Sequence, residues 1–244
     1  MIEPVHPLLA TNKMVYCGEP IAVVIAESRD LAKDAAELIE LDYDELPVVP
    51  SAVEALNPGA PLVWDNAPGN LACDWAYGDK EATDKAFERA AHVVEMDAVQ
   101  NRLVANPMEP RAANAIYDIG KDDYTIYISS QTPHLHRYLA CNKIMGIPEH
   151  KLRVIAPDVG GGFGAKTSMY AEEHLCLFGA KLAGRPVKWV CERSETFVAD
   201  AQARDHVTHA ELALDADGEM LGVRSYHVAD LGPYCLLFGP ISPT

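Results

Sequence analysis

The sequence lacks paired cysteines and long apolar runs. Its six cysteines are scattered without any C-x-x-C pair, which is typical of reduced thiols, so the chain has no zinc or iron–sulfur signature of its own. It also has no run of about 18 apolar residues and no charged-then-apolar leader. We therefore expect no membrane-spanning helix and a cytoplasmic location.

Basic residues are scarce. Twenty Lys and Arg stand against 36 Asp and Glu, which gives a formal net charge of −16. This excess argues against nucleic acid or an anionic membrane as a partner and leaves a small-molecule ligand as the expectation. An anionic ligand would have to be held by local backbone dipoles, because the field of the whole chain repels it. The apolar fraction of 49% suffices for a buried core.

Prolines divide the chain at residues 47–61. Before them, an apolar run at 21–26, an amphipathic segment capped by Ser28 and alternating apolar residues at 39–43 predict a strand, a helix and a strand. The expected organisation is a small α/β unit at residues 1–50, an irregular linker at 51–78 and a larger domain at 79–244.

The larger domain mixes helical and strand patterns, which predicts an α+β fold. Gly120 and Asp217-Gly218 mark two hairpin turns. The expected helices are residues 79–91, 133–145 and 169–183, and the expected strands are residues 93–99, 112–117, 124–128, 154–155, 187–190 and two within 212–228.

A glycine loop is the most informative stretch. Residues 152–166 read LRVIAPDVGGGFGAK, a short strand followed by Gly160–Gly162, Phe163 and Gly164. Glycine permits unusual dihedrals and close approach of backbone N–H groups to an anion. An aromatic residue inside such a run indicates that the loop forms one side of a binding site in addition to binding an anion through its backbone.

Two interpretations of the loop come from general motifs. A P-loop requires glycine where Ala165 stands, so that pattern fails by one residue. A dinucleotide fingerprint is satisfied by Gly160, Gly162 and Ala165, with Glu192 as a late ribose acid. A free-standing NAD-type dehydrogenase would then have a parallel sheet across residues 152–192 and Gly160 at a helix N-terminus.

A third interpretation rests on resemblance. The chain resembles the large, molybdopterin-binding subunit of molybdenum hydroxylases, the family of xanthine dehydrogenase, aldehyde oxidoreductase and carbon monoxide dehydrogenase. The similar motifs, in the family's order, are HPLL at 6–9, GEPIAVV at 18–24, NPMEPR at 106–111, QTPHLHR at 131–137, DVGGGFGAK at 158–166 and GRPVK at 184–188.

This resemblance implies the tail of an α/β hammerhead-like domain followed by most of the first molybdenum-cofactor-binding domain, truncated at its C-terminal end. For the complete enzyme it implies molybdenum on a molybdopterin, in the cytosine dinucleotide form, with no protein ligand to the metal. Absence of the cofactor from residues 1–244 alone is the alternative. The side-chain amide of Gln131 would face a molybdenum oxygen. The backbone at Gly161, Gly162 and Gly164 would approach the cofactor, and the ring of Phe163 would shape the site.

The resemblance also implies limits. The family's catalytic glutamate lies far toward the C-terminus, so no catalytic residue is expected before Thr244, and residues 1–244 alone would be inactive. Thr167 stands where purine-oxidising members carry glutamate, which argues against a purine substrate. An iron–sulfur subunit and an FAD subunit are the implied partners. A non-catalytic assembly module is a further alternative.

Individual side chains carry weaker expectations. Glu109 and Arg111 could form a buried ion pair beneath the site. Lys166 could bind phosphate or lie solvated at a helix start. His134 and His136 lie two apart in a predicted helix, hence on different faces, which disfavours a joint metal site.

Overall fold

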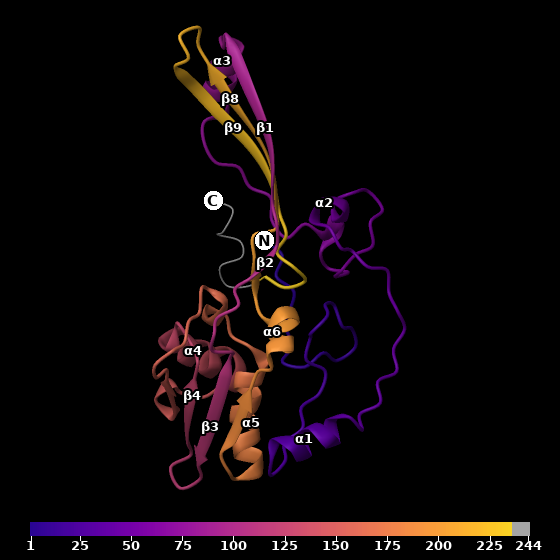
Figure 1. The fold of residues 1–244 in the computed structure, drawn as a ribbon, viewed down its shortest axis with the longest axis vertical. Helices are drawn as coiled ribbons and strands as arrows, with labels where there is room; N and C mark the ends of the chain where they lie inside the picture. Colours follow the sequence, from indigo (N-terminus) through magenta and orange to yellow (C-terminus); the bar gives the residue numbers. More distant parts are fainter. Residues whose placement is uncertain (236–244) are drawn as a thin grey trace. The chain divides into compact units, whose positions relative to one another are not determined.

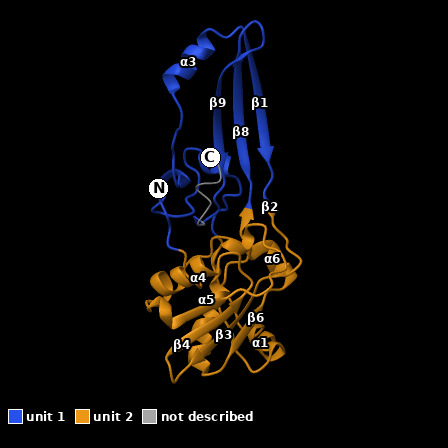
Figure 2. Ribbon diagram, turned by 90° about the vertical axis from the view of Figure 1, so that its left-hand side faces the viewer, with its two compact units in different colours: residues 1–5, 46–103, 203–244 blue, residues 6–45, 104–202 orange. Residues whose placement is uncertain are grey.

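The computed structural model describes residues 1–235, which fall into two compact units (Figure 2). Unit 1 contains residues 1–5, 46–103 and the described residues from 203 onward. Unit 2 contains residues 6–45 and 104–202. The predicted domain limits at residues 50 and 78 stay a prediction, because compactness and sequence domains need not coincide.

Unit 2 is built on a four-stranded sheet in the order β5-β4-β3-β6, of which Figure 1 labels the two central strands β3 and β4. Strands β3 and β4 form the predicted antiparallel hairpin, β5 runs parallel to β4, and β6 runs antiparallel to β3. The strands are β3 Ala112–Asp118, β4 Asp123–Ile128, β5 Leu152–Ile155 and β6 Val187–Val190.

Helix α5 and the π-helical segment Ala140–Met145 supply the other half of the core of this unit. Alternate residues of β3 and β4, such as Ala115 and Ile126, pack with Leu177 and Ala180 of α5. The period of two in the strands and the helical spacing in α5 put these side chains on facing surfaces. The helices of unit 2 are α1 Arg29–Ala36, α4 Pro133–Leu139, α5 Ala171–Ala183 and α6 Arg193–Ala199.

Unit 1 contains a three-stranded antiparallel sheet in the order β1-β8-β9. Helix α3 packs on β9, where a Cβ on Gly222 would lie 3.1 Å from that of Ala86. Its elements are α2 Ala52–Ala55, α3 Lys80–Glu88, β1 His92–Gln100, β8 His206–Leu214 and β9 Met220–Ala229. Strands β2 Leu103–Val104 and β7 Gln202–Ala203 form a separate two-stranded ladder.

Most predicted elements are confirmed, with their caps. Ser28 and Asp79 accept hydrogen bonds from Leu31 N and Ala82 N at the starts of α1 and α3. Gly184 closes α5 in the left-handed conformation, as predicted. The predicted helix at 133–145 is α-helical only to Leu139, and the π-helical segment Ala140–Met145 completes it.

Two predicted strands are wrong. Residues 21–26 and 39–43 form no ladder, and the side chains of Ile21, Val23 and Leu41 are exposed. A strand requires a hydrogen-bonded neighbour, and these segments have none among the described residues. The local sequence pattern alone could not show that these segments lack a neighbouring strand.

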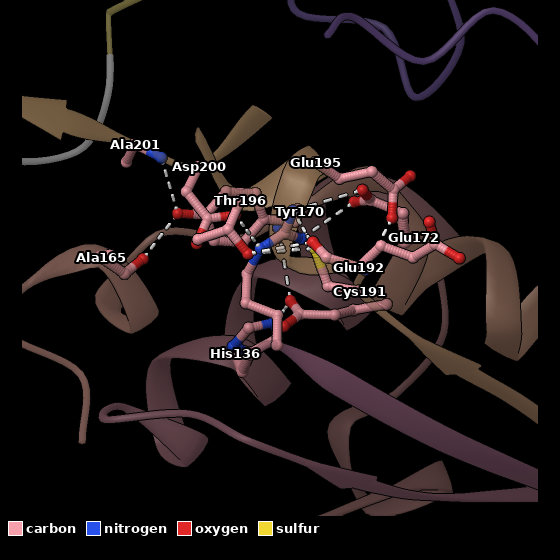
Figure 3. Close-up of polar contacts among 12 residues, drawn as sticks. His136, Ala165, Tyr170, Glu172, Cys191, Glu192, Glu195, Thr196, Asp200 and Ala201 are labelled. Atoms are coloured by element: carbon pink, nitrogen blue, oxygen red, sulfur yellow. Dashed lines mark hydrogen bonds and ion pairs between the residues drawn. The ribbon is translucent and has the colours of Figure 1, made fainter. Parts of the chain in front are cut away.

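Arg111 is 1% exposed and has polar contacts with Tyr170, Glu172 and Asp200, three partners that Figure 3 labels. Its guanidinium donates to Asp200 at 2.6 Å and to Glu172 at 3.2 Å, and stacks 3.6 Å from the ring centroid of Tyr170. Burial would lower the pKa of Arg111, but Glu172 and Asp200 outweigh it and raise that pKa. The expected pair of Arg111 with Glu109 is therefore wrong.

His174 is a second buried polar residue, on α5, with only 2% of its surface exposed. Neither ring nitrogen has a hydrogen-bond partner in the described structure. Burial, followed by the nearby His136, lowers the pKa of His174 to about 4, while Glu173 opposes that change. The folded state therefore favours neutral His174 more than the unfolded state does.

Among the described residues, no helix is both long and apolar enough to cross a bilayer.

The lowered pKa of His174 predicts a pH dependence of stability. Its contribution is complete above the ordinary pKa of 6.5 and is lost as pH falls from 6.5 toward 4, since the unfolded chain then binds the extra proton. We expect the loss to be on the order of 3 kcal/mol. Urea unfolding of wild type and His174→Leu between pH 7 and 4 measures it as a change in their difference.

His134→Leu is the matched control, because His134 is exposed. The stability difference from wild type should change more with pH for His174→Leu than for His134→Leu. If the His174→Leu difference does not change with pH, the pKa argument is contradicted.

Candidate cofactor-binding site

The glycine loop joins β5 to a short 3-10 turn at Ala165–Thr167. Gly161, Phe163 and Gly164 have positive φ angles of 96°, 52° and 91°. A residue with positive φ that follows one with ordinary φ, as at Gly161 and Phe163, can turn successive N–H groups toward one side, as in anion-binding backbone. The local backbone therefore suits the function predicted from its glycines.

The dinucleotide interpretation is wrong. Helix α5 begins at Ala171, well after Gly164, so Gly160 is not at its N-terminus. Strands β5 and β6 lie at opposite edges of the sheet, and β6 is antiparallel to its neighbour. The parallel β-α-β unit that a bound dinucleotide requires is absent from residues 152–192.

Gln131 and the loop converge, as the sequence predicted. The Gly164 N–H donates to Gln131 Oε1 at 3.0 Å, and the Gln131 N–H donates to the carbonyl of Lys166 at 3.0 Å. A Cβ on Gly162 would lie 2.5 Å from Gln131 Cδ. Glycine is thus required at 162 because a side-chain amide occupies the space where a Cβ would project.

This contact fixes the orientation of the Gln131 amide. An N–H donor faces Oε1, so the acceptor end of the amide points to the loop and the Nε2 donors point elsewhere. Those donors have no protein partner in the described structure. Gln131 therefore presents two N–H groups next to the glycine loop.

Three successive backbone donors of the loop are also unpaired within the described chain. These are the N–H groups of Gly161, Gly162 and Phe163. The N–H of Gly164 is already used by Gln131. Among the residues predicted to approach a cofactor by backbone, Gly161 and Gly162 retain a free donor, and Gly164 holds Gln131 in place.

Phe163 has an unusual conformation. A positive φ is strained for an aromatic residue, and 78% of its surface is exposed. Its ring edge lies 3.2 Å from the position of a Cβ on Gly161, so the ring covers the loop backbone. An exposed apolar ring held in a strained conformation fits the predicted role of a wall.

Lys166 is neither a phosphate ligand nor a solvated lysine, so both expectations are wrong. It is 1% exposed, and its Nζ lies 2.8 Å from Glu109 Oε2. The same oxygen accepts hydrogen bonds from Ser129 Oγ and Gly160 N, each at 2.7 Å. Burial raises the pKa of Glu109, but Lys166, Ser129 and Gly160 outweigh it and lower that pKa.

Further residues support the loop from behind. The Tyr170 hydroxyl donates to the carbonyl of Ala165 at 2.7 Å and accepts from Ala201 N at 2.9 Å (Figure 3). Thr132 Oγ1 donates to the carbonyl of Thr167 at 3.3 Å. Sequence reasoning missed Tyr170 and Thr132, since neither lies in a pattern that indicates such contacts.

His136 also lies behind the site. Its Nε2 is 2.6 Å from Glu173 Oε2, and its Nδ1 is 3.3 Å from Ser130 Oγ. It comes from the predicted helix but is buried, whereas His134 is exposed. The expectation that the two histidines occupy different faces of α4 is confirmed.

Family models match both parts of the chain. The model described as "Molybdopterin cofactor-binding domain" matches residues 63–244, and "Aldehyde oxidase and xanthine dehydrogenase, a/b hammerhead domain" matches residues 1–47. The chain belongs to the molybdopterin cofactor-binding domain family. The predicted α+β fold with a hammerhead segment is confirmed.

Relatives agree with this assignment. The chain is 38% identical over 242 residues to the carbon monoxide dehydrogenase large chain of Hydrogenophaga pseudoflava, covering 94% of this chain and 30% of that relative. It is 35% identical over 230 residues to the nicotine 6-hydroxylase large subunit of Paenarthrobacter nicotinovorans, covering 93% of this chain and 28% of that one. The chain thus spans about a third or less of these relatives.

Solved structures support the same family assignment. Carbon monoxide dehydrogenase from Oligotropha carboxidovorans matches with a TM-score of 0.84 and 35% identity, over 90% of this chain and 29% of that chain. Quinoline 2-oxidoreductase from Pseudomonas putida 86 matches with a TM-score of 0.80 and 34% identity, over 92% and 28%. The chain thus has the fold of the matching part of these two enzymes.

Gly162→Ala tests the close approach. The added methyl group would collide with Gln131, so we expect loss of the Gly164–Gln131 hydrogen bond and destabilisation of about 1–3 kcal/mol. The amide chemical shift and hydrogen exchange of Gly164, measured by NMR, report the bond directly. Gly120→Ala is the matched control, because its nearest neighbour would be 3.4 Å away. A Gly162→Ala protein with an unchanged Gly164 amide would refute the packing argument.

Proposed function

We propose that the glycine loop and Gln131 hold the molybdenum–molybdopterin cofactor, so that these residues form one wall of the cofactor site of a molybdenum hydroxylase. The observation that carries the proposal is the hydrogen bond from Gly164 N to Gln131 Oε1. It fixes a side-chain amide donor beside three free backbone donors. An oxygen-rich, anionic group is the ligand that such a set of neutral donors suits.

The residues fit that cofactor. A backbone cradle without a Cβ at Gly160 or Gly162 allows close approach, and neutral N–H groups bind an anion without a basic side chain. A pterin brings its own sulfur ligands, so the protein needs to offer the metal neither Cys nor His. When bound, the cofactor supplies the oxidation–reduction chemistry of the hydroxylase.

Each residue then has a defined role. Gln131 Nε2 would hold the cofactor by donating a hydrogen bond, without ligating the metal. The Gly161 and Gly162 N–H groups face the cofactor, and Gly164 orients Gln131. The ring of Phe163 excludes water from one side of the site. The cofactor form that we propose is the cytosine dinucleotide.

The substrate class and partner subunits that we propose are based on the similar enzymes. We propose oxidation of a small molecule, as in the enzymes similar to carbon monoxide dehydrogenase or aldehyde oxidoreductase, together with an iron–sulfur subunit and an FAD subunit in the cytoplasm. Thr167 argues against a purine. The carboxylates Glu109 and Glu173, close to the loop, are paired with Lys166 and His136. From the resemblance to molybdenum hydroxylases, we propose that the catalytic carboxylate comes from outside residues 1–244 and that these residues alone are inactive.

Gln131→Glu separates the two ends of the amide. One carboxylate oxygen still accepts from Gly164 N, but the other replaces the Nε2 donor with an anionic acceptor. In protein produced in a bacterium that makes molybdopterin, we expect pterin and molybdenum per chain to fall by about 10- to 100-fold. Pterin fluorescence after oxidation and elemental analysis measure the two contents.

Gln100→Glu adds the same charge in unit 1 and should retain the wild-type content. The proposal fails if wild type carries no pterin. It fails equally if Gln131→Glu retains as much pterin as wild type.

A further inference from the structure

The ion pair between Glu109 and the fully buried Lys166 lies beneath the loop and does not involve the free donors of the site. The Lys166 side chain is 0% exposed, and its Nζ contacts Glu109 Oε2 at 2.8 Å. Lysine is almost never fully buried, because desolvating an ammonium group is costly. In a chain of net charge −16, many surface carboxylates could have paired with this lysine in solvent. The buried position therefore requires an explanation.

The geometry supplies one. A single oxygen, Glu109 Oε2, accepts from Gly160 N at the start of the loop and from Lys166 Nζ at its end. It also accepts from Ser129 Oγ, two residues before Gln131. The Glu109 N–H in turn donates to the Gly160 carbonyl at 3.2 Å. Both ends of the loop and the strand end that carries Gln131 thus meet at one carboxylate.

In the described part of the chain, neither Glu109 nor Lys166 forms a hydrogen bond with the free N–H groups that we propose to face the cofactor. The N–H groups of Gly161, Gly162 and Phe163 lie between the two tied ends, and the backbone there takes positive φ angles at Gly161 and Phe163. Such a conformation persists only where the surroundings hold it. The Glu109 side chain is 36% exposed and the Lys166 side chain is 0% exposed, so Lys166 acts through Glu109 and not through the ligand.

We propose that Glu109 and Lys166 are positioning residues for the cofactor: their ion pair closes the loop in the conformation that presents the three free N–H groups. This proposal rests on the proposed function. Removing Lys166 leaves the partly buried Glu109 carboxylate without its cation, and that uncompensated charge would open the loop locally. The cofactor would then bind less well, although no ligand contact has been removed.

Hydrogen exchange and cofactor content together test the positioning role of the Glu109–Lys166 ion pair. In Lys166→Met we expect the exchange rates of the hydrogen-bonded loop amides, Gly164 and Ala165, to rise by about tenfold or more, well beyond any change in the central strand β4. Pterin per chain should fall in parallel. Lys166→Arg retains the charge and should restore part of both.

Lys151→Met is the matched control. Lys151 pairs with Asp123 at 3.3 Å in the same unit, away from the loop, so neither readout should change. If Lys166→Met does not fold, Glu109→Gln replaces it, since Gln retains an acceptor for Gly160 and removes only the charge. It should show the same selective loosening to a smaller extent.

The outcomes separate the two proposals. If wild type carries pterin and the substitution loosens Gly164 no more than β4, or loosens it without loss of pterin, the positioning role is overturned and the proposed function stands. If wild type carries no pterin, the proposed function fails, and the cofactor role of the pair fails with it.

Discussion

The hydrogen bond between the Gly164 amide and the side-chain carbonyl of Gln131 is the contact on which the site depends. It requires a residue without a side chain at 162, a left-handed backbone at 163 and 164, and a strand end that delivers Gln131. Its consequence is directional, because once Oε1 is occupied the Nε2 donors of the amide must point away from the loop.

Neutral donors explain how a strongly acidic chain can hold an anion. The buried cations near the loop are compensated, since Lys166 pairs with Glu109 and Arg111 with Asp200 and Glu172. These ion pairs order the surrounding structure but contribute little net electrostatic field at the loop. Attraction for an anion therefore comes from aligned N–H groups over a short range, where the charge of the distant surface is screened.

Sequence could predict what depends on local pattern and on the resemblance. The helices with Ser28 and Asp79 caps, the β3–β4 hairpin and the convergence of Gln131 with the glycine loop were all predictable. Glycines in a run report backbone requirements directly, and so the loop was recognisable without its surroundings.

The errors concern long-range partners. Glu109 and Arg111 are two residues apart, yet their partners are Lys166, 57 positions away, and Asp200, 89 positions away. Nothing in the local sequence distinguishes a buried lysine from a solvated one. The segment at 21–26 has the composition of a strand, but a ladder needs a neighbour that composition does not specify.

Anomalous X-ray scattering at the molybdenum edge tests the central claim most directly. In crystals of protein purified with its cofactor, the account predicts one molybdenum peak beside the glycine loop, with Gln131 Nε2 donating to an oxygen on the metal. A peak bonded to a Cys or His side chain, or located away from Gln131 and Gly161–Gly164, would contradict it.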